Sequence, residues 1–451
     1  MKSNFMKVGR IIAVTAPILL AACSAPQQTK EVNLTVSGLD PEQFVDTING
    51  KPTALYTLTN ENGMEVCITN LGARIVSIMA PDKDGNLQDV VLGFDNVKSY
   101  ANLNGRTPSD FGAAIGRFAN RINKGKFTLD GVEYDLVKND HGNTLHGGPT
   151  GWQYQVYDVV EADSSSITLQ IVSPDGDNGF PGEVTAKVTY ILNDENNLVI
   201  LYNAVTDKPT VINMTNHSYF NLSGDPNNTV LEDSLLIFAD KMTPIDDKLI
   251  PTGEFRELKP RDPFFFMPER GKPGMKLIGE NINADDEQIK YGNGYDHNWV
   301  LMKPRAEMRD LPLCCIMMSP KSGIVLVERT SEPGVQVYSG NFLNGFVTGK
   351  KGIKYQQRTG ICLETQHYPD SPNKADVKDW TDCVLRPGEE YNSITVFEFH
   401  TTDEMLNGPR KHGMRPGGPR PDGPRPGGPR PGGPRPDGPR PEGAPVPPPA
   451  K

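Results

Sequence analysis

Five short segments of the chain carry residue types that transfer protons or bind hydroxyl groups. They are Gly116-Arg117-Phe118-Ala119-Asn120-Arg121-Ile122, Asn143-Thr144-Leu145-His146-Gly147-Gly148, Thr215-Asn216-His217-Ser218-Tyr219-Phe220-Asn221-Leu222, Gly294-Tyr295-Asp296-His297-Asn298 and Gly360-Ile361-Cys362-Leu363-Glu364-Thr365-Gln366. Imidazoles and carboxylates act as general acids and bases, while amide and guanidinium groups form hydrogen bonds in fixed geometries. We therefore predict a site that moves protons on a polyhydroxylated substrate.

Glu364 stands out because it follows the apolar run Ile361-Cys362-Leu363. That run predicts a largely buried strand, and a buried carboxylate needs hydrogen-bonding partners or a function. Each segment by itself is also compatible with a structural role. A lone histidine on a strand is often a structural hydrogen-bond donor, and Glu364 alone could be an ordinary outward-facing residue. The prediction depends on the combination of the segments.

The elements that must position these residues have the period of strands. Apolar residues alternate with polar ones in three stretches, and an Asn-rich turn, 193–197, separates the second stretch from the third. The stretches are Ile167-Leu169-Ile171, Val184-Ala186-Val188-Tyr190 and Leu198-Ile200-Tyr202, and shorter runs follow the same pattern at Val66-Ile68, Ile75 to Met79 and Ile324 to Val327. No stretch of helical period exceeds three turns. This pattern predicts a hairpin across the turn and an all-β sandwich of antiparallel strands.

Composition excludes nucleic-acid binding. The formal net charge is −10 and the sequence pI is about 5.3, whereas such proteins need a concentrated basic face. The cysteines after Cys23 are odd in number and none has C-x-x-C spacing: Cys67, Cys314, Cys315, Cys362 and Cys383. We expect them to be mostly buried small hydrophobic residues. The histidines at 141, 146, 217, 297 and 367 are scattered, so spacing predicts no metal site.

The N-terminus predicts export and lipid anchoring. Basic residues up to Arg10 precede an apolar run, 11–22, that is too short to span a bilayer easily. Leu20-Ala21-Ala22-Cys23 resembles the lipobox of bacterial lipoproteins, in which the cysteine is acylated after cleavage. We expect residues 1–22 to be a signal peptide, residues 23–37 a lipidated tether, and the protein to lie in the bacterial cell envelope, on the periplasmic or outer-membrane side. An ordinary cleaved signal is the alternative.

The C-terminal segment, 403–451, differs from the rest of the chain. An Arg-Pro-(Gly/Asp)-Gly-Pro unit repeats with a period of five from Met414 to Pro441. Proline fixes φ and removes backbone donors, so this segment is predicted to be an extended, disordered tail. Its role is either a spacer or basic contact with anionic envelope polymers, or none.

A series of motifs runs in order through the folded part of the chain: Asp89-Val90-Val91-Leu92-Gly93-Phe94, Gly116-Arg117, Leu145-His146-Gly147-Gly148, Ser173-Pro174-Asp175-Gly176, Asn216-His217-Ser218-Tyr219-Phe220-Asn221-Leu222, Asp296-His297-Asn298, Pro333-Gly334-Val335-Gln336, Leu363-Glu364-Thr365-Gln366 and Leu385-Arg386-Pro387-Gly388-Glu389. In these motifs the chain resembles the galactose mutarotase (aldose 1-epimerase) family. The resemblance implies a mutarotase β-sandwich over residues 38–402, an open sugar cleft, and a reaction on free hexoses such as glucose or galactose without an organic cofactor. A monomer is expected.

The resemblance also implies roles for single residues. Glu364 matches the general base, His217 the general acid, and His146 the second active-site histidine. The positions that match sugar-binding residues are Asn120, Arg121, Asp296 and Gln336. Tyr219 and Phe220 either form an aromatic wall or pack in the core. Some bacterial relatives are associated with calcium, and Asp175, Asp177 and Asn178 offer oxygen ligands.

Three other functions stay open at this point. Asp296 and Glu364 could form the carboxylate pair of a glycoside hydrolase, although that chemistry does not require His217. A non-catalytic carbohydrate-binding lipoprotein would need no acid–base pair. A hexose-6-phosphate epimerase should carry additional basic groups, and no such cluster lies near the motifs.

Overall fold

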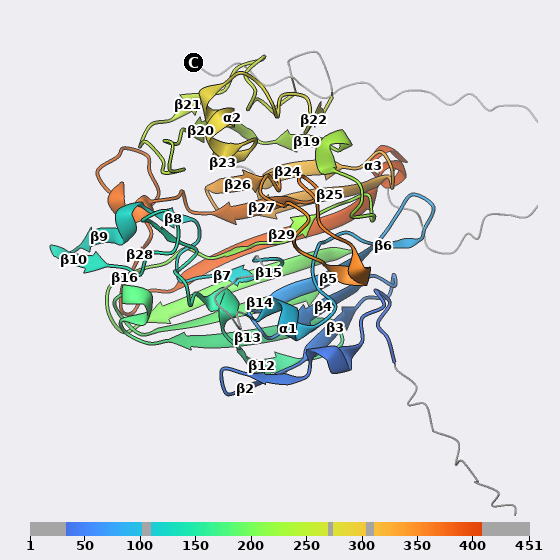
Figure 1. Ribbon diagram of the computed structural model, residues 1–451, viewed down its shortest axis with the longest axis horizontal. Helices are drawn as coiled ribbons and strands as arrows, with labels where there is room; N and C mark the ends of the chain where they lie inside the picture. The colour runs from blue at the N-terminus through green and yellow to red at the C-terminus, as the bar shows by residue number, and fades with distance from the viewer. Residues whose placement is uncertain (1–32, 102–109, 269–273, 304–310, 408–451) are drawn as a thin grey trace, which may run out of the picture. The chain divides into compact units, whose positions relative to one another are not determined.

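The computed structural model describes residues 33–101, 110–268, 274–303 and 311–407, and in these residues nearly all regular structure is β. Figure 1 shows long strands separated by loops and a few short helices. The α-helices among the described residues are α1 (Val97–Tyr100), α2 (Glu287–Gly292) and α3 (Thr402–Asn407). The predicted absence of long helices is confirmed for this part of the chain.

The largest sheet has nine strands, and every pair of neighbours in it is antiparallel. Its order is β12 (Asp158–Ala162), β13 (Ser166–Ser173), β14 (Val184–Leu192), β15 (Asn197–Thr206), β29 (Tyr391–Thr401), β25 (Ile324–Thr330), β24 (Leu313–Met318), β19 (Ser234–Ile237) and β22 (Lys276–Leu277). The predicted hairpin is β14–β15, where Leu192 pairs with Leu198 across the Asn-rich turn.

Two smaller antiparallel sheets accompany the large one. A six-stranded sheet has the order β18 (Tyr219–Phe220), β27 (Ile361–Gln366), β26 (Gly334–Tyr338), β23 (Asp296–Leu301), β20 (Ala239–Thr243) and β21 (Arg256–Glu257). A four-stranded sheet contains β3 (Leu55–Thr59), β4 (Glu65–Thr69), β5 (Arg74–Pro81) and β6 (Leu87–Asp89). The predicted strands at Val66–Ile68, Ile75–Met79 and Ile324–Val327 are therefore confirmed.

Short two-stranded ladders fix the loops around the sheets. They are β7 (Ala114–Ile115) with β17 (Thr215–Asn216), β8 (Arg121–Ile122) with β11 (Thr144–Leu145), β9 (Lys126–Leu129) with β10 (Val132–Asp135), β16 (Thr210–Val211) with β28 (Val384–Leu385), and β1 (Asp46–Ile48) with β2 (Lys51–Thr53). The first two ladders hold the segments that contain His217 and His146.

One hydrophobic core joins the three larger sheets, as a sandwich requires. Its members include Ile75 of the four-stranded sheet, Val188 and Ile200 of the nine-stranded sheet, and Val337 and Leu363 of the six-stranded sheet. Burying each such side chain stabilises the fold by about 1.5–3 kcal/mol. Because successive strand residues point to opposite faces, the neighbours of Val337 and Leu363 face away from this core. That second face of the six-stranded sheet is where the polar residues gather.

The ends of the described chain differ in detail from the expected boundaries. The predicted tether already packs at its end, because the backbone N–H groups of Val36 and Ser37 donate to the Glu65 carboxylate. The first residues of the predicted tail, 403–407, belong to helix α3. Cys23, the predicted signal peptide and residues 408–451 lie outside the described residues. No helix in the described ranges has the length and hydropathy needed to cross a membrane.

Candidate active site

The second face of the six-stranded sheet and the loops above it form a cleft. Strand register places Gln336 directly opposite Glu364, and Tyr338 opposite both Asp296 and Cys362. The loops that carry His146 and His217 lie above these strands. The cleft is lined by Asp110, Asn120, Arg121, Leu145, His146, His217, Tyr219, Asp296, Tyr338, Phe342 and Glu364. Seven of the eight predicted site residues therefore lie in one cleft, and Gln336 adjoins it.

His217 and Glu364 form the closest acid–base pair in the cleft. His217 Nε2 lies 3.7 Å from Glu364 Oε1, and the two side chains are 7% and 2% exposed. Burial is the main reason that the pKa of Glu364 lies well above its ordinary value, and the nearby Asp296 and Asp110 raise it further. Burial lowers the pKa of His217. Both shifts disfavour charge, so they favour a pair that carries one proton, on Glu364, over an ion pair.

His146 is held in a defined tautomer. Its Nδ1 accepts a hydrogen bond of 3.1 Å from the backbone N–H of Asn120, so in the neutral ring the proton is on Nε2. Burial, together with His217 and Arg121, lowers the pKa of His146 to about 3. His146 is therefore neutral over the physiological pH range. It offers the cleft a neutral N–H donor and is not an acid that titrates.

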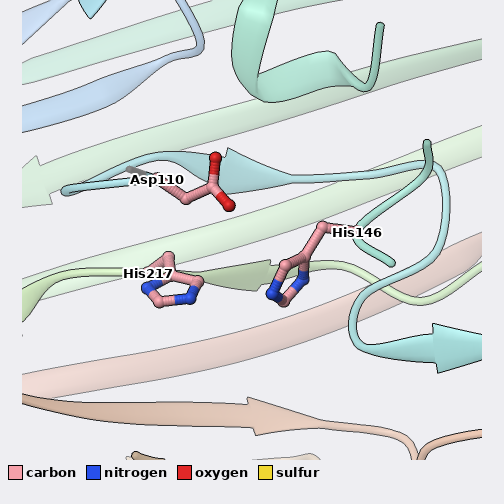
Figure 2. Close-up of side chains that lie close together, drawn as sticks. All are labelled: Asp110, His146 and His217. Atoms are coloured by element: carbon pink, nitrogen blue, oxygen red, sulfur yellow. The ribbon is translucent and has the colours of Figure 1, made fainter. Parts of the chain in front are cut away.

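Figure 2 shows the two imidazoles and the Asp110 carboxylate arranged around a common space. The rings of His146 and His217 are 5.2 Å apart and nearly perpendicular. Asp110 Oδ1 accepts a hydrogen bond of 2.6 Å from Tyr154. Potential ligand atoms of Asp110, His146 and His217 lie within 4.8 Å of one another, as do those of His217, Cys362 and Glu364. Spacing along the sequence did not predict either cluster.

The predicted sugar-binding residues are held by hydrogen bonds to one another and to nearby groups. Arg121 Nε donates to Asp140 Oδ2 at 2.7 Å, and the Arg121 backbone N–H donates to Asn120 Oδ1. Gln336 Nε2 donates to Asp296 Oδ1 at 2.7 Å. Burial raises the pKa of Asp296, whereas Arg121 and Gln336 oppose that shift. These bonds orient guanidinium, amide and carboxylate groups before a ligand enters.

The two aromatic candidates have different positions. Tyr219 lines the cleft and stacks on the His217 ring, with 5.2 Å between ring centroids. Phe220 is fully buried and packs against Phe397 in the core. Phe220 therefore packs in the core, whereas Tyr219 lines the cleft, and its role as an aromatic wall for a sugar stays a prediction.

Three cleft residues were not singled out from the sequence: Asp110, Tyr338 and Phe342. Tyr338 stands two residues after Gln336 on β26, so the two-residue strand period would have placed it on the same face. Phe342 stacks on Tyr338 at the cleft rim and is 58% exposed. Asp110 belongs to none of the five polar segments, and only the fold brings it beside the histidines.

The oxygen groups considered for calcium do not fit such an ion. Asp175 accepts hydrogen bonds from the Gly182 backbone N–H and from Lys208 Nζ. Asp177 accepts hydrogen bonds from Ser173 Oγ and Asn178 Nδ2. Calcium requires six to eight oxygen ligands, whereas these carboxylates already bind protein donors. They stabilise the turn that follows β13.

The five cysteines in the described part of the chain are all buried and unpaired. This agrees with their expected role as small hydrophobic residues. Cys314 and Cys315 donate to Oε2 of the fully buried Glu328, which lies outside the cleft.

Comparison with known proteins places the chain and its fold in a family. A family model described as aldose 1-epimerase matches residues 54–398. The chain is 39% identical to the galactose mutarotase of Mus musculus over 336 residues, which cover 74% of this chain and 91% of the mouse protein. It is 36% identical to the aldose 1-epimerase of Escherichia coli strain K12 over 354 residues, which cover 78% and 96% of the two chains.

Solved structures agree with this result. The aldose epimerase homologue from C. elegans matches with a TM-score of 0.69 at 30% identity, covering 77% of this chain and 99% of that one. Galactose 1-epimerase from Lactobacillus acidophilus NCFM matches with a TM-score of 0.65 at 28% identity, covering 79% and 97%. The expected all-β sandwich is confirmed. The chain belongs to the aldose 1-epimerase family, whose members are carbohydrate isomerases that interconvert the anomers of aldoses.

Proposed function

We propose that this protein interconverts the α and β anomers of a free aldohexose such as glucose or galactose, with Glu364 and His217 as its acid–base pair. The observation that supports this proposal is the approach of His217 Nε2 to Glu364 Oε1 at 3.7 Å in a cleft lined by hydrogen-bonding groups. A protein that only binds sugar does not require such a pair.

Ring opening needs one base and one acid. Glu364 accepts the proton of the sugar's O1 hydroxyl while the C1=O1 double bond forms and the C1–O5 bond breaks. The electron pair of that bond goes to O5, which takes a proton from His217. Each such group typically contributes about 10²–10⁴-fold to the rate.

Ring closure reverses these transfers. After rotation about C1–C2, O5 attacks the other face of the carbonyl, His217 recovers the O5 proton, and Glu364 returns a proton to O1. The pair therefore holds one proton at the start and one at the end. The opposite pKa shifts of Glu364 and His217 favour the same count in the free protein but place the proton on Glu364, so that proton moves to His217 before ring opening begins.

The remaining cleft residues orient the sugar and stabilise charge. His146 donates from Nε2 to an oxygen that becomes negative during ring opening, because its Nδ1 is held by Asn120. Arg121, Asn120, Asp296 and Gln336 bind the other hydroxyl groups. Tyr219 presents an aromatic face beside His217.

Polarimetry of freshly dissolved α-D-glucose and α-D-galactose tests the activity. The protein should accelerate the approach to the anomeric equilibrium for at least one of these sugars. A chromogenic glycoside is the control for hydrolysis, and a hexose 6-phosphate is the control for phosphosugar preference. Calorimetric binding without acceleration would favour the non-catalytic sugar-binding alternative, and chromophore release would favour the hydrolase.

We further propose that the protein is a monomeric lipoprotein of the bacterial cell envelope. Support comes from the basic N-terminus, the apolar run, and Leu20-Ala21-Ala22-Cys23 at its end. In this proposal Cys23 is acylated, residues 24–37 connect the anchor to the sandwich, and the Pro/Arg-rich tail follows helix α3.

Metabolic labelling with a radioactive fatty acid tests the anchor. The full chain should incorporate label and fractionate with membranes, and Cys23→Ala should do neither. Cys67→Ala is a matched control, because Cys67 is buried in β4. Label that persists in Cys23→Ala would refute the anchor, and light scattering on the soluble part would test the monomer.

A further inference from the structure

Several buried polar atoms lie beside the catalytic carboxylate without a protein partner. They belong to Asn298, Gln336, Glu364 and Gln366, each of which is at most 3% exposed. The atoms that lack a hydrogen-bonding partner among the described residues are Asn298 Oδ1 and Nδ2, Gln336 Oε1, Glu364 Oε2, and Gln366 Oε1 and Nε2. A buried polar atom left unsatisfied costs about 1–3 kcal/mol. Six such atoms together require a common explanation.

Strand register gathers these side chains on one face of the six-stranded sheet. Gln336 on β26 is opposite Asn298 on β23 and opposite Glu364 on β27. Gln366 follows Glu364 by two residues, so it points to the same face. The four polar groups therefore extend the cleft face along the strands, away from the Asp296 end.

Gly334 provides the space for this group. It pairs with Gln366, and a Cβ atom at Gly334 would lie 2.6 Å from Asn298 Oδ1 and 2.9 Å from the Tyr368 ring. The absence of a side chain lets the Asn298 amide lie over the neighbouring strand, with Tyr368 as a wall. The Asn298 amide therefore lies over Gly334, the partner of Gln366, and Gln336 lies between Asn298 and Glu364 in the register.

The unpaired atoms include both hydrogen-bond donors and acceptors, which indicates the kind of ligand that they bind. Asn298 and Gln366 each leave both a donor and an acceptor unpaired. A cation would bind the oxygens and leave the N–H groups unpaired, whereas water both donates and accepts. Internal waters typically form about three hydrogen bonds to buried polar groups of this kind.

We propose that Asn298, Gln336 and Gln366 hold a cluster of internal water molecules that donates to Glu364 Oε2, and that Gln366 is a positioning residue for this carboxylate. The inference rests on the proposed function, in which Glu364 is the base. Water on Oε2 fixes the carboxylate so that Oε1 faces His217. Hydrogen bonds from water also favour the ionised carboxylate.

Other groups around Glu364 also influence its pKa, in addition to the proposed water cluster. Two of these groups, His217 and Asp110, lie on loops, and Arg121 lies on β8. The others lie on strands of the sheet: Asp296 on β23, Tyr338 on β26, Tyr219 on β18 and Cys362 on the same strand as Glu364. Asp296 and Asp110 disfavour its ionised form, and Arg121 favours it. Removing the water cluster leaves all these groups in place, so its contribution can be measured separately.

Gln366→Met tests the proposal, because methionine keeps the length of the side chain and removes both amide partners. The ionised Glu364 carboxylate then loses hydrogen bonds from water, which raises its pKa. The alkaline limb of the kcat profile should therefore move to higher pH by about one unit, and KM should change less than about twofold. Gln288→Met is the matched control. Its amide is buried but bonds only the Ile245 backbone, so it should lower Tm and leave the limb unchanged.

A high-resolution crystal structure of the unaltered protein gives a readout that is independent of activity. Ordered waters bridging Gln366 or Asn298 to Glu364 Oε2 support the proposal. Amides bonded directly to each other, or a cation coordinated by their oxygens, overturn it. An active protein whose alkaline limb is the same in Gln366→Met also overturns it, whereas a wild type without mutarotase activity refutes the proposed function instead.

Discussion

His146 offers a prediction that separates hydrogen bonding from proton transfer. His146→Asn keeps an acceptor near the position of Nδ1, so the backbone N–H of Asn120 retains its bond. The variant loses the Nε2 donor to the cleft. His146 has φ of +50°, a left-handed conformation that asparagine adopts more readily than most residues. The variant is therefore expected to fold.

The size of the effect follows from the state of the ring. With a pKa of about 3, His146 is about 1% protonated at pH 5, so it acts as a neutral donor throughout the working range. A hydrogen bond to an oxygen that becomes charged contributes about 1.5–3 kcal/mol. Because about 1.4 kcal/mol corresponds to tenfold in rate, kcat/KM should fall by about 10- to 150-fold.

Polarimetry over a range of pH measures both parts of this prediction. In His146→Asn the rate should fall while both limbs of the pH profile keep their positions. His146→Gln is the matched control, because its amide nitrogen reaches toward the position of Nε2 and restores a donor, so more activity should remain. A pH limb that disappears in His146→Asn would show that His146 titrates, which the reasoning excludes.

Two further predictions concern carboxyl groups, one beside the catalytic pair and one in the core. Asp110→Asn removes a negative charge that raises the pKa of Glu364. The alkaline limb of the kcat/KM profile should therefore move to lower pH by roughly a few tenths to one unit. A shift of this limb to higher pH would show that the Asp110 charge does not act on Glu364 in this way. Glu328 is fully buried, and burial raises its pKa from 4.5 to about 8. The folded protein therefore holds a proton that the unfolded chain releases above pH 4.5, and stability falls as pH rises from there to about 8. Glu328→Gln should thus increase the free energy of unfolding at pH 7 by up to roughly 3 kcal/mol, with little change near pH 4.5, as measured by urea denaturation; equal changes at both pH values would rule out this origin.

The sequence predicted the strands better than the distances between them. The two-residue alternation in Val184–Tyr190 and Leu198–Tyr202 depends only on which face is buried, and it identified β14 and β15 directly. The small ladders that hold the histidine segments have only two residues per strand. Such short pairs have no period that a sequence can reveal.

The site was predicted residue by residue but not as a geometry. Glu364, His217 and His146 stood in recognisable segments, yet their approach depends on loops far apart in the chain. The protonation states also required the fold, because the pKa values of Glu364 and His217 shift mainly through burial. The ordinary pKa of histidine predicts a protonated His217 near neutral pH, whereas burial lowers this pKa and favours the neutral ring. A single proton shared between Glu364 and His217 lets His217 act as an acid despite its lowered pKa.

The central claim is that Glu364 and His217 together catalyse anomer exchange. Its most direct test is the rate at which α-D-glucose or α-D-galactose approaches equilibrium, measured by polarimetry with the wild type and with Glu364→Gln, alongside calorimetric sugar binding by both. The wild type should accelerate the approach, and Glu364→Gln should still bind sugar but lose at least about 10²-fold of the rate. A Glu364→Gln variant that equilibrates the anomers as fast as the wild type would show that Glu364 is not the catalytic base.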